Sequence, residues 1–179
     1  GAAEVNICPG EHVSTDANWV VVSPVRITGA SSETTFLERG RVLIDGSESV
    51  SISHLTIRDG QGAPYTEVLW VGGAIEVYTA SVTLSHVVLD GNNAACGGAI
   101  AGYLTSSFEI EDSIVRNNTA WSGECGGGAI ILDEATLRST NTDWGSGPND
   151  NVPNDIYVGS TAGINRYSFG AAATFACSG

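Results

Sequence analysis

Apolar and polar residues alternate in short runs along the chain, and the same run recurs at a nearly constant interval. Each run closes on an apolar residue that is soon followed by Gly, Asp or Asn. These closing residues are Ile27, Ile57, Leu89, Val115 and Trp144, at intervals of 26 to 32 residues. Such alternation is typical of short strands with one buried face, so the five residues are expected to form one interior stripe.

Each closing residue is preceded by apolar or small residues two, five and seven positions earlier. The change from even to odd offsets predicts a two-residue corner between two short strands. In the first run these positions are Val25, Val22 and Val20, which we expect to face the interior. The corners fall at Ser23-Pro24, Ser53-His54, Ser85-His86, Glu111-Asp112 and Thr140-Asn141.

A third strand in each repeat begins at the sequence GGAI, which occurs at 72–75, 97–100 and 127–130. Its apolar column runs near Ile7, Leu43, Ile75, Ile100, Ile130 and Ile156. Glycine destabilises a strand and is kept where the backbone must turn sharply or lie against other backbone. We therefore expect each glycine pair to turn the chain tightly into the next coil.

Three short strands per 25 to 36 residues, without helical periodicity, predict an all-β fold, a single-stranded right-handed parallel β-helix of about five to six coils. Coils about 4.8 Å apart would make a rod about 25 Å long. An antiparallel sandwich is the alternative, but it does not require the same offsets in five successive segments.

The repeats predict one domain over 1–179, with an N-terminal coil and cap at 1–40, regular coils at 41–158, and a C-terminal coil and cap at 159–179. The first and last coils of a solenoid must protect their open strand edges. We expect the segment at 10–19 and the tail from Gly159 onward to do so.

The chain is strongly acidic, with 20 acidic residues, seven arginines, no lysine and a net charge of -13. Nucleic acids and anionic membranes bind basic patches, so the composition argues against both as partners. The sequence shows no signal peptide and no apolar run long enough to insert directly into a membrane, as expected of a mature chain or an excised fragment. The composition suits an extracellular protein.

The four cysteines are Cys8, Cys96, Cys125 and Cys177. An even number in this acidic chain favours disulfides and an oxidising compartment, whereas a zinc site would need a C-x-x-C or a nearby histidine pair. Cys96 and Cys125 precede successive GGAI segments by nearly the same offset, which predicts a Cys96–Cys125 disulfide between adjacent coils. The pairing of Cys8 and Cys177 stays open.

The GGAI segments at Gly72 and Gly127, each followed 17 residues later by a strand end at Leu89 or Trp144, carry a family resemblance. With the sequences LDGN and VRNN, they resemble the GGA[ILV] and FxxN motifs of the polymorphic outer membrane protein repeats and of other bacterial right-handed parallel β-helix proteins. Leu89 and Val115 replace the aromatic residue of FxxN, and its asparagine is absent at Gly60 and Gly147. The resemblance implies a surface-displayed, often adhesive module.

Equivalent residues of successive coils stack along such a rod, so one corner column would hold Pro24, His54, His86, Asp112 and Asn141. A catalytic interpretation makes His86 an acid or base oriented by Asp112, with Arg116 close by. The alternative, which we favour because no nucleophile converges there, is a polar ladder that satisfies corner backbone groups. The outward column Thr28, Arg58, Asp90, Arg116 and Gly145 is likewise either an anion site or a ladder of surface ion pairs.

The candidates for stacking on sugar rings or protein partners are aromatic: Tyr65, Trp70, Trp121, Tyr78 and Tyr103. The last two each follow the Ile of a GGAI segment by three residues and could stack on adjacent coils. No cofactor is expected. Calcium is the cation that Asp150 and Asp155 would suit, although the segment lacks the spacing of a cation loop and a solvated loop is the alternative.

These features favour a non-catalytic secreted or cell-surface module that binds an extracellular protein or a polysaccharide, or that serves as a display scaffold and self-associates. The alternative is a small polysaccharide lyase or glycoside hydrolase of the pectate-lyase-like class. That alternative requires converging carboxylates and a basic residue, whereas the carboxylates of this sequence are scattered.

Overall fold

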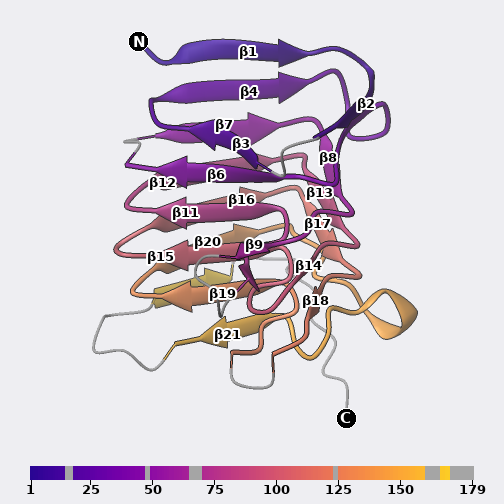
Figure 1. The fold of residues 1–179 in the computed structure, drawn as a ribbon, viewed down its shortest axis with the longest axis vertical. Helices are drawn as coiled ribbons and strands as arrows, with labels where there is room; N and C mark the ends of the chain where they lie inside the picture. The colour runs from indigo at the N-terminus through magenta and orange to yellow at the C-terminus, as the bar shows by residue number, and fades with distance from the viewer. Residues whose placement is uncertain (15–17, 47–48, 65–69, 123–124, 160–165, 170–179) are drawn as a thin grey trace.

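The computed structural model describes residues 1–14, 18–46, 49–64, 70–122, 125–159 and 166–169. These residues wind into an all-β parallel solenoid of about five turns with three parallel sheets. The turns stack along the long axis, from β1 at one end to β21 near the other (Figure 1). The predicted fold class, an all-β solenoid with three strands per coil, is therefore confirmed.

Successive turns contribute strands to each of the three sheets. Sheet A contains β1 (Ala3–Ile7), β4 (Val25–Gly29), β7 (Val50–Ser53), β12 (Ser81–Ser85), β16 (Ser107–Glu111), β20 (Thr136–Thr140) and β22 (Arg166–Phe169). Sheet B contains β2 (Gly10–Val13), β5 (Thr35–Glu38), β8 (Thr56–Arg58), β13 (Val88–Asp90) and β17 (Ile114–Arg116). Sheet C contains β3 (Asn18–Val21), β6 (Arg41–Asp45), β11 (Ile75–Tyr78), β15 (Ile100–Tyr103), β19 (Ile130–Asp133) and β21 (Ile156–Val158).

Short elements occupy the connections between sheets B and C. Strand β14 (Asn93–Ala94) pairs in parallel with β18 (Thr119–Ala120), and β9 (Ala63–Pro64) pairs antiparallel with β10 (Trp70–Val71). A 3-10 turn, η1, spans Gly147–Asn149.

Inward side chains of all three sheets form one core, as the alternation predicted. In the regular turns the predicted register is confirmed: Ile57, Leu89 and Val115 are paired across sheet B, and Trp144 follows them as a fully buried side chain. In sheet C the pairs run from Ile75 through the isoleucines of the next three turns.

The predicted register is wrong in the first turn. Ile27 pairs with Ile52 in sheet A, and Leu37 takes the place beside Ile57 that was predicted for Ile27. The connection between β4 and β5 spans residues 30–34, whereas two-residue corners join sheets A and B in the later turns. This longer connection breaks the spacing on which the predicted register was based. The run that ends at Ile27 is therefore a sheet A strand, not a sheet B strand.

Other first-turn placements also differ from the prediction. Val20 and Val22 are exposed rather than interior, Ile7 lies in sheet A rather than sheet C, and Val42 rather than Leu43 pairs with Ile75. Within the segment at 10–19, residues 10–13 form β2 and residues 18–19 begin β3, and the expected capping role stays a prediction.

The glycine pairs have the predicted role. Gly97 has a φ of +60°, in the left-handed region that glycine adopts without strain. A Cβ at Gly98 would lie 2.2 Å from the carbonyl oxygen of Gly128 in the next turn. The first glycine therefore makes the sharp turn, and the second allows neighbouring backbones to approach.

A buried ladder of asparagines runs along the connection that follows sheet B. Asn118 Nδ2 donates to Leu89 O (3.1 Å) and Asn151 Oδ1 (2.9 Å), and Asn92 Nδ2 donates in the same way to Ile57 O (3.1 Å) and Asn118 Oδ1 (3.0 Å). The asparagine that the motif lacked at Gly147 is thus supplied by Asn151, after the insertion that contains η1. The ladder satisfies main-chain groups that the buried corner would otherwise leave unpaired.

Candidate functional site

The corner between sheets A and B presents a column of exposed polar side chains. His54, His86, Asp112 and Asn141 occupy equivalent positions, with φ values of 55°, 56°, 48° and 49°. The rings of His54 and His86 are stacked, with centroids 4.9 Å apart and planes 5° apart. Pro24, predicted for this column, does not belong to it. Thr28 pairs with Ser53, so the residue that takes the position before His54 in the column is Gly29.

Hydrogen bonds orient the side chains of this column. Ser85 Oγ and His86 Nδ1 are 2.9 Å apart, and Asn141 Nδ2 donates to Asp112 Oδ1 at 2.5 Å. The bond between Asn141 and Asp112 joins side chains of adjacent turns, and the interpretation as a ladder that satisfies corner backbone groups stays a prediction. A catalytic role for His86, Asp112 and Arg116 stays a prediction.

The outward column of sheet B is a ladder of ion pairs. Arg116 donates to Asp90 Oδ2 from Nε at 3.0 Å and from Nη2 at 2.9 Å. Arg58 binds Glu38, which replaces the predicted Thr28 in this column, and lies 4.1 Å from the centroid of the Phe36 ring. These pairs link each arginine to the preceding turn, and each partly exposed pair contributes at most about 1 kcal/mol.

The outer face of sheet C contains a buried ion pair that the sequence did not reveal. Arg41 and Glu76 are 6% and 1% exposed and bind each other directly. Arg41 also donates to Asn18 Oδ1 (2.7 Å) and Val71 O (2.9 Å), and Tyr78 Oη donates to Glu76 Oε1 (2.5 Å). Burial raises the pKa of Glu76, and the Tyr78 hydrogen bond and the Arg41 charge oppose this effect.

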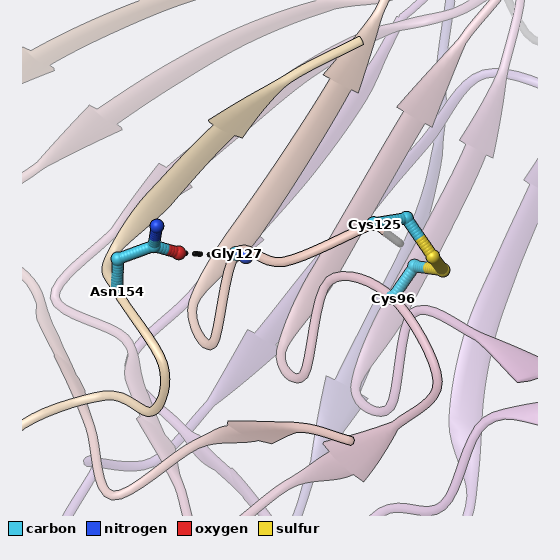
Figure 2. The surroundings of a disulfide bond; sticks show 4 residues. All are labelled: Cys96, Cys125, Gly127 and Asn154. Atoms are coloured by element: carbon cyan, nitrogen blue, oxygen red, sulfur yellow. Dashed lines mark hydrogen bonds between the residues drawn. A yellow bond between two sulfur atoms is a disulfide. The ribbon is translucent and has the colours of Figure 1, made fainter. Parts of the chain in front are cut away.

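Loops cover the neighbouring part of the same face and form a second apolar cluster, in which Val71, Ala95 and Cys96 pack over Ala101 and Ile131. The predicted disulfide is confirmed: Cys96 and Cys125 are bonded, with Cα atoms 5.3 Å apart. Figure 2 shows this bond joining two adjacent loops.

The chain of the next turn is hydrogen-bonded to the segment that follows Cys125, since Gly127 N donates to Asn154 Oδ1 at 2.9 Å (Figure 2). Cys8 is exposed and has no disulfide partner among the described residues. Cys177 lies outside the described residues, so its pairing stays open.

The aromatic candidates fall into different environments. Tyr78 and Tyr103 stack across adjacent turns as predicted, with ring centroids 5.4 Å apart, so each has one ring face against the other. Trp121 is 59% exposed on the connection after β18. Tyr65 and the side chain of Trp70 lie outside the described residues.

The two calcium candidates lie at the C-terminal end of the asparagine ladder. Asp155 Oδ1 accepts a hydrogen bond from Asn151 Nδ2 at 2.8 Å. Its pKa is raised to about 6, mainly by burial and further by the carboxylates of Asp150 and Asp143, although the Asn151 hydrogen bond lowers it. Within the described residues, no three His, Cys, Asp or Glu side chains are grouped so that they could hold a metal ion. Calcium binding stays a prediction.

A scan of protein-family models found no match to this chain, and searches of curated proteins and of solved structures found none either. Among the described residues, no helix is long and apolar enough to cross a membrane. The arguments about function therefore rest on the solenoid and its exposed side chains.

Proposed function

We propose that this chain is a non-catalytic extracellular or cell-surface module that binds a polysaccharide or an extracellular protein through the loops over sheet C. The observation that supports this proposal best is the exposure of Trp121, 59% of whose surface lies in water. Exposed aromatic side chains with a fixed backbone are well suited to stack on sugar rings or to fill a partner's pocket.

The backbone of Trp121 is fixed by the preceding turn. Trp121 N donates to Ala94 O at 3.1 Å, and Ser122 N donates to Ala95 O at 3.0 Å. The neighbouring loop begins at Cys96, whose disulfide to Cys125 links the two connections covalently. A ligand that stacks on Trp121 would therefore order little backbone, which lowers the entropic cost of binding.

Binding to a glycan array and to extracellular proteins tests this proposal, with calorimetry for any ligand found. We expect Trp121→Ala to weaken binding at least tenfold and Trp121→Phe to retain most of it. Leu104→Ala is the matched control, because Leu104 is another exposed apolar side chain, 53% exposed, at a corner between sheets C and A. Equal affinity of wild type and Trp121→Ala would refute the role of Trp121.

The same polysaccharide panel, incubated with Ca²⁺ and assayed for new reducing or unsaturated ends, tests the lyase or glycoside hydrolase alternative. Any turnover that His86→Asn abolishes would replace the binding proposal with an enzymatic one. Absence of ligand binding together with concentration-dependent oligomers in solution would instead favour a self-associating scaffold.

The resemblance to the polymorphic outer membrane protein repeats supports secretion or surface display, right-handed winding and function without a cofactor. The net charge of -13 favours partners that are neutral or basic over nucleic acids. Fractionation of the native organism's cells, followed by detection of the chain outside the cytoplasm, tests the proposed location.

A further inference from the structure

We propose that His54 and His86 form a binding site for one borderline divalent transition-metal ion, Cu²⁺, Ni²⁺ or Zn²⁺. The two side chains leave the same corner position of consecutive turns, and both are exposed. Their rings are stacked, with centroids 4.9 Å apart and planes 5° apart. Two imidazoles are thus placed side by side by the fold, without contribution from a distant segment.

The backbone at both positions is well defined. His54 N donates to Ser85 O, and His86 N donates to Glu111 O, each at 3.2 Å, so that each corner is hydrogen-bonded to the next turn. Both histidines have left-handed φ values near 55°, which are uncommon for residues with a Cβ. The separation of the two Cα atoms is therefore fixed by the stacking of the turns, and only the side-chain torsions need adjust.

A chelate requires the two rings to tilt toward each other. Zinc–nitrogen distances of about 2.0–2.1 Å require two ligating nitrogens about 3 Å apart, which is closer than the stacked rings. Because both side chains lie in solvent, rotation about their side-chain bonds can tilt the rings toward each other. Imidazole is a ligand of zinc, copper and nickel, whereas calcium and magnesium prefer oxygen.

The surroundings favour a cation at this corner. Ser85 Oγ lies 2.9 Å from His86 Nδ1 and orients that ring, which leaves Nε2 for the metal, as partners of the second nitrogen do in metal sites. Asp112 follows in the next turn, with its carboxylate held by Asn141 at 2.5 Å. Two protein ligands leave coordination positions for water or for a ligand from a partner molecule.

Calorimetric titration with NiCl₂ and CuCl₂ tests the site, using protein without a polyhistidine tag and carrying Cys8→Ser, because the exposed Cys8 thiol binds the same metals. The variants are His54→Asn and His86→Asn, since Asn141 occupies an equivalent corner with φ 49°. His12→Asn is the matched control. We expect one ion per chain, at least tenfold weaker binding in each corner variant, and unchanged binding in the control.

Electron paramagnetic resonance of the Cu²⁺-loaded parent protein adds a readout that needs no corner variant. Hyperfine coupling to two imidazole nitrogens supports the site, and a spectrum with oxygen ligands alone overturns it. Wild-type affinity in both His54→Asn and His86→Asn, or a loss of binding caused by His12→Asn alone, would also overturn the proposal. Glycan binding through Trp121 is measured separately, so that either proposal can fail without the other.

Discussion

Replacement of Asn118 by alanine should be among the most destabilising single changes in this chain. The side chain is fully buried and takes part in four hydrogen bonds. Its Oδ1 accepts from Asn92 N at 3.0 Å and from Asn92 Nδ2 at 3.0 Å. Its Nδ2 donates to Leu89 O at 3.1 Å and to Asn151 Oδ1 at 2.9 Å.

The expected magnitude follows from the groups that alanine would leave without this partner. The Asn92 N–H loses its side-chain acceptor inside a buried corner, and a buried unsatisfied group costs about 1–3 kcal/mol. The weakened contacts of Leu89 and Asn151 and the small cavity left behind add to this cost. We therefore expect Asn118→Ala to lower the free energy of unfolding by about 3–5 kcal/mol.

Thermal and urea unfolding under oxidising conditions, followed by circular dichroism, measure this effect. For a chain of this size, 1 kcal/mol corresponds to about 2–4 °C in Tm, so a fall of about 6–20 °C is expected. Asn93→Ala is the control, because Asn93 is an exposed neighbour of Asn92 and should change Tm little. A Tm for Asn118→Ala within 2 °C of the Asn93→Ala value would refute the assignment of a stabilising ladder, on the scale of about 2–4 °C per kcal/mol.

Three further changes test other parts of the fold. Asp155 has a folded pKa of about 6 against 3.8 for the free carboxyl, so the group should lower stability as pH rises from about 4 to 6. The full difference corresponds to about 3 kcal/mol, which we discount to about 1 kcal/mol because the carboxyl is partly exposed. Asp155→Asn should therefore raise Tm at pH 8 but not at pH 3.5, and an equal change at both values would contradict this. Arg41→Met leaves Glu76 buried without its counter-charge and should lower the free energy of unfolding by about 3–5 kcal/mol, measured by urea unfolding. The double variant Arg41→Met with Glu76→Leu should be more stable than the single variant. Joint replacement of Cys96 and Cys125 by serine opens a loop closed over a separation of 29 residues and should cost about 3 kcal/mol; reducing agent should then shift the wild-type Tm but not that of the variant.

The regular turns could be predicted from sequence because their geometry repeats. Between β7 and β17, each sheet A strand is joined to its sheet B strand by two residues. Leu84 and Leu89 therefore recur at fixed offsets from their counterparts in the next turn, Ile110 and Val115. The Cys96–Cys125 disulfide was predictable for the same reason, since both cysteines precede a glycine pair.

The first turn could not be predicted, because its connection at 30–34 is longer than the corners that follow. The run at Val25–Gly29 has the alternation of a strand in either sheet, and nothing in its own sequence identifies the sheet. Only the pairing of β4 with β7 shows that this run belongs to sheet A. A local insertion thus shifts the register without disturbing the periodic signal.

Burial of the charged pair could not be predicted for a different reason. Glu76 alternates with the inward Ile75 and Val77, so its position in β11 predicts an outward, solvated carboxylate. The loop residue Val71, whose carbonyl accepts a hydrogen bond from Arg41, lies over this position. Outward residues of a solenoid strand are buried whenever a connection folds back over them, and alternation alone does not report this.

In a repeating solenoid, a column of like residues has the same sequence signature whether it stabilises the rod or binds a ligand. A residue that differs from its counterparts in the column is more informative about function, because stacking of the turns does not explain the difference. Ala94 and Ala120 are paired between β14 and β18, and the next residues are Ala95, which is 1% exposed, and Trp121, which is 59% exposed. The turn before Trp121 thus keeps a small buried side chain at the position where Trp121 presents a large apolar one to water. Since the fold tolerates alanine there, packing of the solenoid gives no reason for the tryptophan, and for this reason the proposed binding function is assigned to Trp121.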